Sequence, residues 1–536
     1  MQVFAYKMCN FLKKVFQCPL ISGDFFAYIW TNLLRVYVQK KNILHFFCKK
    51  VNLFLAISIF FCTFAAKNKT VECMQLVGRE KELKELVRLK ESSQAEFVVL
   101  YGRRRVGKTF LVRSFFDDKF TFYCTGLAKG SRKQQLANFG KMLSEYSGKS
   151  IQPKDWFDAF GSLKTILTNS RQKRKVVFLD EVPWMDTQKS EFKQALDLFW
   201  NGWAMMQQNL LFIICGSAAS WMVKNVINDK GGLHNRLTCK LHLSPFSLKD
   251  TKSYLQNQGF RWTDEMIANC YMILGGIPYY LHLLDKSLSL AQNIDRLFFE
   301  DSALLSDEFY NLYSSLFKKA DDYIKIITQL SKKKSGYTRL ELIQLLKQNT
   351  GGGFTRRLEE LEQCGFIRKY LPVSGKTHIY QLVDFFTLFY LQFGASKDTF
   401  DSNIWMHLQN SGKYSTWLGL SFERLCFAHI SQLQRALGIS GVATKTYALQ
   451  TSSAQMDMVI ERADNIINLC EMKYTSGAYA ITKDEAKKLQ NRIQELSCLF
   501  PKKSVIPVLI TDSQAKKNEY YNQFIYNNIT LKDLFV

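Results

Sequence analysis

The sequence predicts an α/β fold built around a parallel sheet, and three observations lead to this prediction. Apolar runs rich in β-formers recur between residues 97 and 215, separated by helical patterns, as the crossovers of a parallel sheet require. A glycine-rich loop follows the first run, and two adjacent carboxylates end the third. The expected strands are residues 97–101, 120–124, 176–179 and 210–215, with helices at 133–146 and 191–203.

The segment before the predicted sheet has a different composition. Residues 1–73 hold ten Lys/Arg and two Asp/Glu, and an apolar run at 51–66 follows Lys49 and Lys50. The run resembles a signal-peptide core or a short membrane anchor, but it is shorter than a span of about 20 residues. The globular pattern begins just after Met74. We therefore expect the true start at Met74, with an N-terminal membrane anchor as the alternative if residues 1–73 are present.

Charge and cysteine usage constrain the partners and the compartment. The net charge is +25, and the first 73 residues contribute ten minus two, or +8, which leaves +17 for the rest. This excess predicts a polyanionic partner, with nucleic acid first and a membrane surface second, unless the basic faces serve only solubility. The thirteen cysteines include no C-x-x-C pair. This favours reduced thiols in the cytoplasm over disulfides or a zinc site.

Residues 102–109, Gly-Arg-Arg-Arg-Val-Gly-Lys-Thr, fit the phosphate-loop pattern G-x-x-x-x-G-K-[ST]. They stand between a predicted strand and a helical stretch, so backbone N–H groups and a helix N-terminus can converge on phosphate oxygens. The lysine supplies charge for the β- and γ-phosphates, and the threonine supplies a hydroxyl for Mg²⁺. A chance glycine turn is the alternative. The predicted ATP-binding residues here are Gly102, Val106, Gly107, Lys108 and Thr109.

The third apolar run ends in Asp180 and Glu181, the arrangement of a Walker B segment. At the carboxyl end of a parallel strand, Asp180 can reach the hydrated Mg²⁺ beside Thr109. Glu181 can then orient or deprotonate the attacking water. A helix cap after a core strand is the alternative reading of this acidic pair.

Two further polar residues follow the same logic. Ser217 comes directly after the fourth apolar run, which would place it near the γ-phosphate as a polar sensor; an ordinary strand-ending turn is the alternative. Arg236 can stabilise transition-state charge, from the same or a neighbouring subunit of a homo-oligomer. A basic surface turn is the competing interpretation of Arg236.

The middle of the chain changes character twice. Residues 248–290 are mostly helical in pattern, interrupted at Gly275-Gly276-Ile277-Pro278. Residues 319–391 then follow the order helix, helix, helix and β-hairpin, which is that of a winged helix. Thr338 and Glu341 form a capping box there. Arg356 and Arg357 open its last helix, where DNA contact is expected, although docking on the nucleotide domain is the alternative.

The C-terminal region holds a second group of charged residues. A hairpin centred on position 464 sets Asp457 opposite Glu471, and Lys473 shares the face of Glu471. This is the D…E-x-K arrangement of PD-(D/E)xK nucleases, in which the carboxylates hold Mg²⁺ and the lysine orients water or offsets phosphate charge. An exposed hairpin that pairs charges for solubility is the alternative.

Five motifs in order resemble the archaeal-type ATPases of the AAA+/STAND group, a prokaryotic family whose members carry a winged helix and a C-terminal nuclease-like domain. The resemblance covers residues 74–536. It implies that Gly78 and Arg79 lie near the adenine, that a helical lid senses nucleotide state, and that Glu423 joins the metal ligands. The family commonly has Tyr-Gly-Arg where this chain has His-Asn-Arg at 234–236. The motifs are residues 77–80, 102–109, 179–181, 216–217 and 275–278.

The expected whole is a P-loop NTPase core with a helical lid, a winged helix and a C-terminal α/β restriction-endonuclease-like domain. Its expected function is ATP hydrolysis with Mg²⁺, coupled to a Mg²⁺-dependent nuclease that acts on nucleic acid, most simply DNA. The alternative is an ATP-driven switch whose last domain binds a partner without cleaving. The expected boundaries are 74–244 for the core, 245–315 for the lid, 316–395 for the winged helix and 410–536 for the nuclease-like domain, with 1–73 upstream.

Overall fold

The computed structural model describes residues 76–536, apart from 230, 234, 372–376, 395–403, 452–453 and 476. The predictions for residues 1–73 lie outside the described residues, and so does His234. Among the helices that are described, none is both long and apolar enough to cross a membrane.

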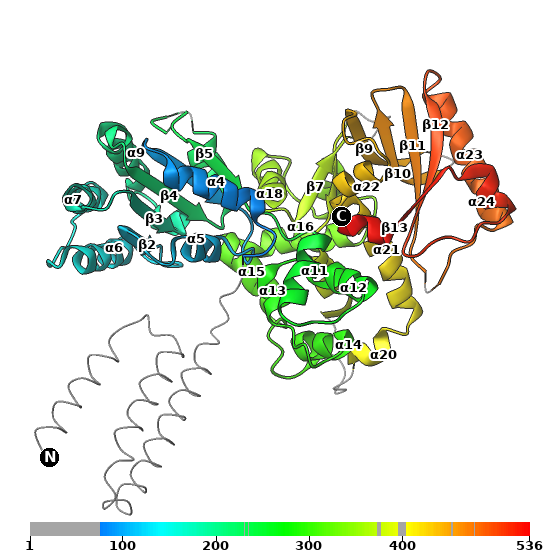
Figure 1. The fold of residues 1–536 in the computed structure, drawn as a ribbon, viewed down its shortest axis with the longest axis horizontal. Helices are drawn as coiled ribbons and strands as arrows, with labels where there is room; N and C mark the ends of the chain where they lie inside the picture. The colour runs from blue at the N-terminus through cyan, green and yellow to red at the C-terminus, as the bar shows by residue number, and fades with distance from the viewer. Residues whose placement is uncertain are drawn as a thin grey trace, which may run out of the picture. The chain divides into compact units, whose positions relative to one another are not determined.

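The first sheet has five parallel strands in the order β2-β3-β4-β1-β5 (Figure 1). Its strands are β1 (Glu96–Tyr101), β2 (Phe122–Thr125), β3 (Lys175–Asp180), β4 (Leu210–Gly216) and β5 (Cys239–His242). All seven positions of β4 are buried, which explains why the apolar runs were readable as strands. The predicted α/β fold with a parallel-sheet core is confirmed, and β5 is a strand that the sequence did not reveal.

Helices pack against this sheet and form its core. Buried side chains of α6, α7 and α9, among them Phe139, Trp156 and Phe192, pack with the apolar residues of the strands. The packing fixes the carboxyl ends of β1, β3 and β4, where the phosphate loop and the acidic pair lie. The helices and turns of this region are α4 (Glu80–Glu91), α5 (Lys108–Phe116), α6 (Arg132–Ser147), α7 (Trp156–Asn169), α8 (Val182–Met185), α9 (Phe192–Gly202), η1 (Ala204–Met206), α10 (Ala219–Met222) and η2 (Val223–Ile227).

A helical segment, residues 248–316, follows the sheet. The turn between its second and third helices needs glycine, because Gly276 has φ 63° and a Cβ there would lie 2.5 Å from the carbonyl oxygen of Phe246. Pro278 opens α13, where its missing N–H costs nothing. The elements are α11 (Leu248–Asn257), α12 (Asp264–Leu274), α13 (Pro278–His282), α14 (Leu290–Ile294), η3 (Asp295–Phe299) and α15 (Glu308–Leu316).

The next part, called here the three-helix segment, comprises residues 320–382. Its helices are α16 (Ala320–Ser331), α17 (Arg339–Leu345) and α18 (Gly352–Gln363), and its strands are β6 (Tyr337–Thr338), β7 (Ile367–Tyr370) and β8 (Ile379–Leu382). The strands form an antiparallel sheet in the order β6-β8-β7. Thr338 and Glu341 make the expected capping box at the start of α17. Two short helices, α19 (Phe385–Phe389) and η4 (Tyr390–Gly394), follow.

The C-terminal segment, residues 404–536, is built on a second sheet in the order β13-β12-β11-β10-β9 (Figure 1). Strands β9 to β11 are antiparallel and β11 to β13 parallel. Pairs such as Met458 with Cys470 reproduce the predicted hairpin register. The elements are α20 (Ile404–Leu408), α21 (Gly412–Ala428), α22 (Ile430–Ala436), β9 (Thr444–Gln450), β10 (Gln455–Arg462), β11 (Ile466–Lys473), α23 (Lys483–Leu499), β12 (Ser504–Thr511), α24 (Glu519–Phe524), β13 (Asn527–Thr530) and η5 (Leu531–Phe535).

Candidate functional site

The phosphate-loop sequence forms a tight turn between β1 and α5. Gly102 has φ 146°, and a Cβ there would lie 2.2 Å from the carbonyl oxygen of Leu243, so only glycine fits. Gly107 has φ 87° and is the N-cap of α5. This left-handed glycine leads the loop directly into α5, and a helix N-terminus that follows a glycine loop is an arrangement that binds phosphate oxygens.

Lys108 is buried at the first turn of α5. Its Nζ donates hydrogen bonds to the loop's own carbonyl oxygens, those of Gly102 at 3.1 Å and Arg103 at 2.9 Å. The ammonium is therefore held over the loop, in position to contact phosphates that the loop surrounds.

Thr109 and Asp180 meet across the carboxyl edge of the sheet. The hydroxyl of Thr109 donates a hydrogen bond to Oδ2 of Asp180 at 2.7 Å. Burial and then the charge of Glu181 raise the pKa of Asp180 above its ordinary value, while the Thr109 hydrogen bond opposes the rise. A hydroxyl and a carboxylate oxygen side by side are the ligands that Mg²⁺ prefers, so these two residues fit the metal.

Glu181 and Ser217 form a second contact at the same edge. Oε2 of Glu181 accepts hydrogen bonds from the hydroxyl of Ser217 at 2.8 Å and from its backbone N–H at 3.2 Å. Glu181 also has φ 50°, an uncommon conformation for a residue with a side chain. The carboxylate of Glu181 therefore lies at the end of β4, next to Ser217.

The Gly78-Arg79 pair lies against the phosphate loop. The guanidinium of Arg79 donates to the carbonyl oxygen of Val106 at 3.0 Å and stacks on the ring of Phe246, 4.8 Å from its centroid. Gly78 has φ 64°, and a Cβ there would come within 2.6 Å of Asp250 on α11. This pair therefore contacts both the loop and the helical segment.

Two arginines of the loop bind elements far away in sequence, which the sequence did not predict. Arg105 makes a two-point ion pair with Glu308 of α15, at 2.8 and 2.7 Å, and stacks on Tyr279 of α13 at 4.0 Å. Arg103 is buried and forms an ion pair with Asp384, the N-cap of α19. The loop is thereby tied to the helical segment through Glu308 and, through Asp384, to the start of α19 just after the three-helix segment.

Arg236 is separate from this group. Its side chain is exposed in the loop before β5. Among the described residues, no hydrogen bond or ion pair joins that side chain to Lys108, Asp180 or Glu181. Within a single chain, Arg236 therefore lies on the surface, not in the assembled site.

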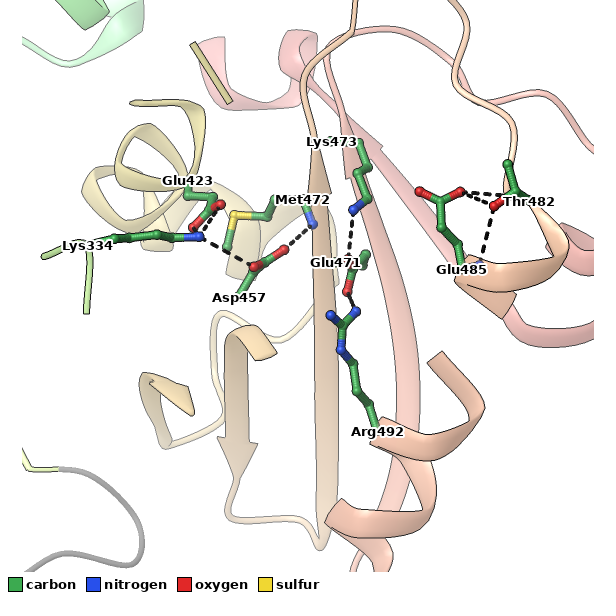
Figure 2. A network of polar contacts seen from close by, with 9 residues as sticks. All are labelled: Lys334, Glu423, Asp457, Glu471, Met472, Lys473, Thr482, Glu485 and Arg492. Atoms are coloured by element: carbon green, nitrogen blue, oxygen red, sulfur yellow. Dashed lines mark hydrogen bonds and ion pairs between the residues drawn. The ribbon is translucent and has the colours of Figure 1, made fainter. Parts of the chain in front are cut away.

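The C-terminal carboxylates form two ion-paired groups (Figure 2). In the first, Glu423 of α21 binds the ammonium of Lys334 through both oxygens, at 2.5 and 2.6 Å, and Asp457 lies 3.8 Å from the same ammonium. In the second, Glu471 binds Lys473 at 3.0 Å and Arg492 of α23 at 2.5 Å. The backbone N–H of Met472 donates to Asp457 at 3.3 Å and lies between the groups.

A β-bulge lies in β10 at the position of Asp457. The pairing of β10 with β9 shifts between Met456 and Val459, so residues 457 and 458 face one residue of β9. Asp457 and Glu423 share the ammonium of Lys334, although the β10–β11 register continues to Asp457 opposite Glu471. Within the described residues, no three His, Cys, Asp or Glu side chains are close enough to hold a metal ion. The predicted set of Asp457, Glu471 and Glu423 is not a ready-made metal site in this conformation.

Burial perturbs the titration of these carboxylates. Burial, and then the charge of Asp457, raise the pKa of Glu423 to about 7 against the opposing ion pair with Lys334. Burial and the charge of Glu471 raise the pKa of Asp457. Burial alone would lower the pKa of Lys473, but the carboxylates of Glu471 and Asp457 raise it above its ordinary value. Carboxylates shifted in this way are typical of functional sites, although structural ion-pair networks produce them too.

A cleft of about 240 Å³ borders the first group of carboxylates. Both the three-helix segment and the C-terminal segment line it, and its charged lining residues include Lys334, Arg368, Glu423, Arg424 and Asp457. Lys334, Arg368 and Arg492 were not identified from the sequence. The run Lys332-Lys333-Lys334 before a glycine turn was the one local signal available.

Comparisons with known proteins agree with the first site. Residues 76–284 match the model of a family described as an ATPase domain predominantly from Archaea. An uncharacterized protein of Methanocaldococcus jannaschii is 25% identical over 370 residues, which are 67% of this chain and 78% of that protein. An uncharacterized ATP-binding protein of the same organism is 44% identical over 46 residues, 9% of this chain and 78% of that protein.

Solved structures show more distant similarity. A Walker-type ATPase of Pyrococcus abyssi is 17% identical and has a TM-score of 0.43, covering 59% of this chain and 96% of that chain. The ORC2 protein of Aeropyrum pernix is 14% identical with a TM-score of 0.37, covering 62% of this chain and 95% of that chain.

Proposed function

We propose that this chain, which carries an ATPase domain of the archaeal type at residues 76–284, hydrolyses ATP with Mg²⁺ and uses nucleotide state to control its C-terminal segment. The observation that carries the proposal is the contact of Thr109 with Asp180 at 2.7 Å, with Glu181 directly after it. A metal-binding pair next to a second carboxylate is what ATP hydrolysis requires.

Each residue of this site has a distinct role in the proposal. The loop backbone between Gly102 and Gly107 binds the phosphates, and the ammonium of Lys108 balances their charge. Thr109 and Asp180 hold Mg²⁺, which neutralises charge on the phosphates when it is bound. Glu181 accepts the proton of the attacking water, and Ser217 orients Glu181 through its two hydrogen bonds.

Arg79, with Gly78, borders the nucleotide from the adenine side, in contact with Val106 of the loop. Arg236 acts from a neighbouring copy of the chain in a homo-oligomer. Its exposure in the single chain supports this arrangement, because an arginine supplied by a second subunit must lie on the surface of the first.

The loop arginines provide the coupling. Arg105 holds Glu308 of the helical segment, which acts as a lid, and Arg103 holds Asp384, just after the three-helix segment. Nucleotide binding changes the charge next to both arginines. Because these ion pairs join separate segments, a change at the loop is transmitted to the lid and to the segment that leads into the C-terminal region.

The three-helix segment has the element order of a winged helix, and the C-terminal segment has the D…E-x-K residues of PD-(D/E)xK nucleases. In the proposal, Asp457, Glu471 and Glu423 bind Mg²⁺, and Lys473 contacts the scissile phosphate of DNA. The net charge of +17 outside residues 1–73 supports a nucleic-acid partner.

A second candidate function is a nucleotide switch whose C-terminal segment binds a partner and cleaves nothing. The observation that favours it is the pairing of the three carboxylates with Lys334, Lys473 and Arg492. Such pairing is also what a structural charge network would show.

DNA cleavage separates the two candidates. The full chain is incubated with supercoiled DNA, ATP, and Mg²⁺ or Mn²⁺, next to the variants Asp457→Ala and Lys473→Ala. Cleavage that both substitutions abolish, while ATP turnover continues, supports the nuclease. Cleavage by neither the wild type nor the variants, with normal ATP turnover, supports the switch.

A further inference from the structure

We propose that Lys334 is a built-in counter-ion that holds the Glu423–Asp457 carboxylates in a form closed to divalent cations, so that movement of its loop opens the C-terminal site. This inference rests on the proposed function, in which these carboxylates bind a metal. The inference adds that the position of Lys334 controls metal binding by these carboxylates.

The contact joins two different parts of the molecule. Lys334 lies on the loop between α16 and β6, while Glu423 lies 89 residues further on, in α21. The ammonium contacts both oxygens of Glu423 and also Asp457 (Figure 2). The three side chains are 30%, 15% and 13% exposed. The ammonium of Lys334 lies between two carboxylates that are largely out of water. It therefore neutralises the negative charge that a metal ion bound to the same carboxylates would neutralise.

The charge balance of the carboxylates and their cation partners explains why this conformation does not favour a divalent cation. Three carboxylates, those of Glu423, Asp457 and Glu471, face three cations, those of Lys334, Lys473 and Arg492. Their charges sum to zero, whereas a site for Mg²⁺ needs an excess of carboxylate charge. Lys473 lies on β11 with Glu471, and Arg492 lies on α23, so both belong to the C-terminal segment. Lys334 is the one of the three cations that comes from another segment, and it is the one that can leave with that segment.

The loop that carries Lys334 is held in place by its backbone. Nε2 of Gln381 on β8 donates to the carbonyl oxygen of Lys334, and the same Gln381 accepts a hydrogen bond from Arg368. Gly336 has φ 80°, and a Cβ there would lie 2.3 Å from the carbonyl oxygen of Tyr380 on β8. Strand β8 therefore positions the backbone of Lys334, and the ion pairs with Glu423 and Asp457 fix its side chain.

Strand β8 also leads to the nucleotide site. Asp384, two residues after the end of β8, is the partner of Arg103 in the phosphate loop. One short stretch of chain thus holds the backbone of Lys334 at Gln381 and the loop arginine at Asp384. A rearrangement of the Arg103–Asp384 pair on nucleotide binding acts on the strand that positions the counter-ion.

The neighbouring Lys333 offers a matched control. Its ammonium pairs with Glu341 at 3.2 Å and stacks on Tyr337 at 4.9 Å, within its own segment. Removing Lys333 takes away the same charge next to the same loop but leaves the C-terminal carboxylates paired.

Mn²⁺ binding to the nucleotide-free full chain tests the proposal, with free Mn²⁺ measured by electron paramagnetic resonance. Lys334→Met should bind one Mn²⁺ about tenfold or more tightly than the wild type, since an opposing charge has been removed from a largely buried site. Lys333→Met should match the wild type, and adding Glu423→Gln to Lys334→Met should remove the gain. Gln381→Ala keeps Lys334 but removes the hydrogen bond that holds its loop, so we expect a smaller increase in Mn²⁺ affinity. This variant tests the proposal even if Lys334→Met folds poorly. Wild-type affinity in both Lys334→Met and Gln381→Ala would overturn the proposal.

DNA cleavage distinguishes failure of this inference from failure of the proposed function. Tighter Mn²⁺ binding by Lys334→Met without cleavage under any condition supports the counter-ion and rejects the nuclease. If the wild type and Lys334→Met both cleave DNA, and at the same rate, the result rejects the counter-ion role of Lys334 and supports the nuclease function.

Discussion

Asp180 and Glu181 are neighbours in the chain, but their surroundings differ. Asp180 is buried and bonded to Thr109, whereas Glu181 leaves the strand in a left-handed conformation and binds Ser217. The change in backbone direction at Glu181 separates the two carboxylates, as their proposed roles in metal binding and water activation require. Two residues that the sequence shows only as a pair thus have different partners and surroundings in the structure.

Replacing Glu181 with glutamine should separate binding from chemistry. The amide keeps the size of the side chain and can still accept a hydrogen bond from Ser217, but it cannot take a proton. We expect ATP turnover to fall by about 10²–10⁴-fold while the affinity for a fluorescent ATP analogue changes little. A Glu181→Gln variant that turns over ATP at the wild-type rate would remove Glu181 from the proposed role.

At the level of elements, single ion pairs and hydrogen bonds join segments that are distant in sequence. Arg103 and Asp384 are 281 positions apart, yet both are almost completely buried. The imidazole of His429, at the end of α21, accepts a hydrogen bond from the N–H of Leu248, the first residue of α11, at 3.0 Å. These contacts replace water for groups that would otherwise be buried without partners.

Removing Arg103 should destabilise the chain strongly. Asp384 would keep its bonds to Thr387 but lose its cation, and a buried charge left unpaired costs about 3–5 kcal/mol. We expect the free energy of unfolding of Arg103→Ala, from urea denaturation, to fall by about that amount. Arg104→Ala is the control, because Arg104 forms no ion pair with any described residue. Similar losses for the two variants would contradict a specific role for the Arg103–Asp384 pair.

The His429 contact should make stability depend on pH. Burial lowers the pKa of His429 below its ordinary value of 6.5, with partial opposition from the carbonyl of Leu425 and from Asp250. The unfolded chain therefore binds more protons than the folded chain in mild acid, and the free energy of unfolding falls as pH drops below about 6.5. His429→Gln can still accept from the Leu248 N–H but does not titrate.

Urea denaturation at several pH values between about 5 and 8 measures this effect. The wild type should lose stability toward the acid end more steeply than His429→Gln. Parallel pH profiles for the two proteins would show that His429 does not contribute.

For the whole molecule, the sequence predicted what depends on local pattern and missed what depends on distant contacts. The strands β1, β3 and β4 were recognisable because strands buried on both faces are almost entirely apolar. Strand β2, at the sheet edge, alternates buried and half-buried positions. Strand β5, Cys-Lys-Leu-His, has one fully buried position and looks like a loop. The phosphate loop and the acidic pair have fixed spacings, so their meeting at the sheet edge could be anticipated.

The C-terminal site shows more clearly which contacts the local sequence pattern could not predict. The hairpin register of Asp457 and Glu471 followed from simple counting, but the bulge in β10 has no sequence signature here, and neither has the Lys334 contact that Asp457 shares with Glu423. Lys334 and Arg492 belong to other elements, so no local pattern relates them to the carboxylates they bind. The expected metal site therefore appears in the structure as two ion-paired groups.

ATP turnover by the full chain and by Lys108→Ala tests the central claim most directly. Without the ammonium over the loop, the phosphates lose their nearest positive charge, and the structure offers no other lysine in contact with the carbonyls of Gly102 and Arg103 among the described residues. We predict Mg²⁺-dependent phosphate release by the wild type and a loss of at least about 10²-fold in Lys108→Ala. Equal turnover by the two proteins, or no turnover by the wild type, would contradict an ATPase centred on this loop.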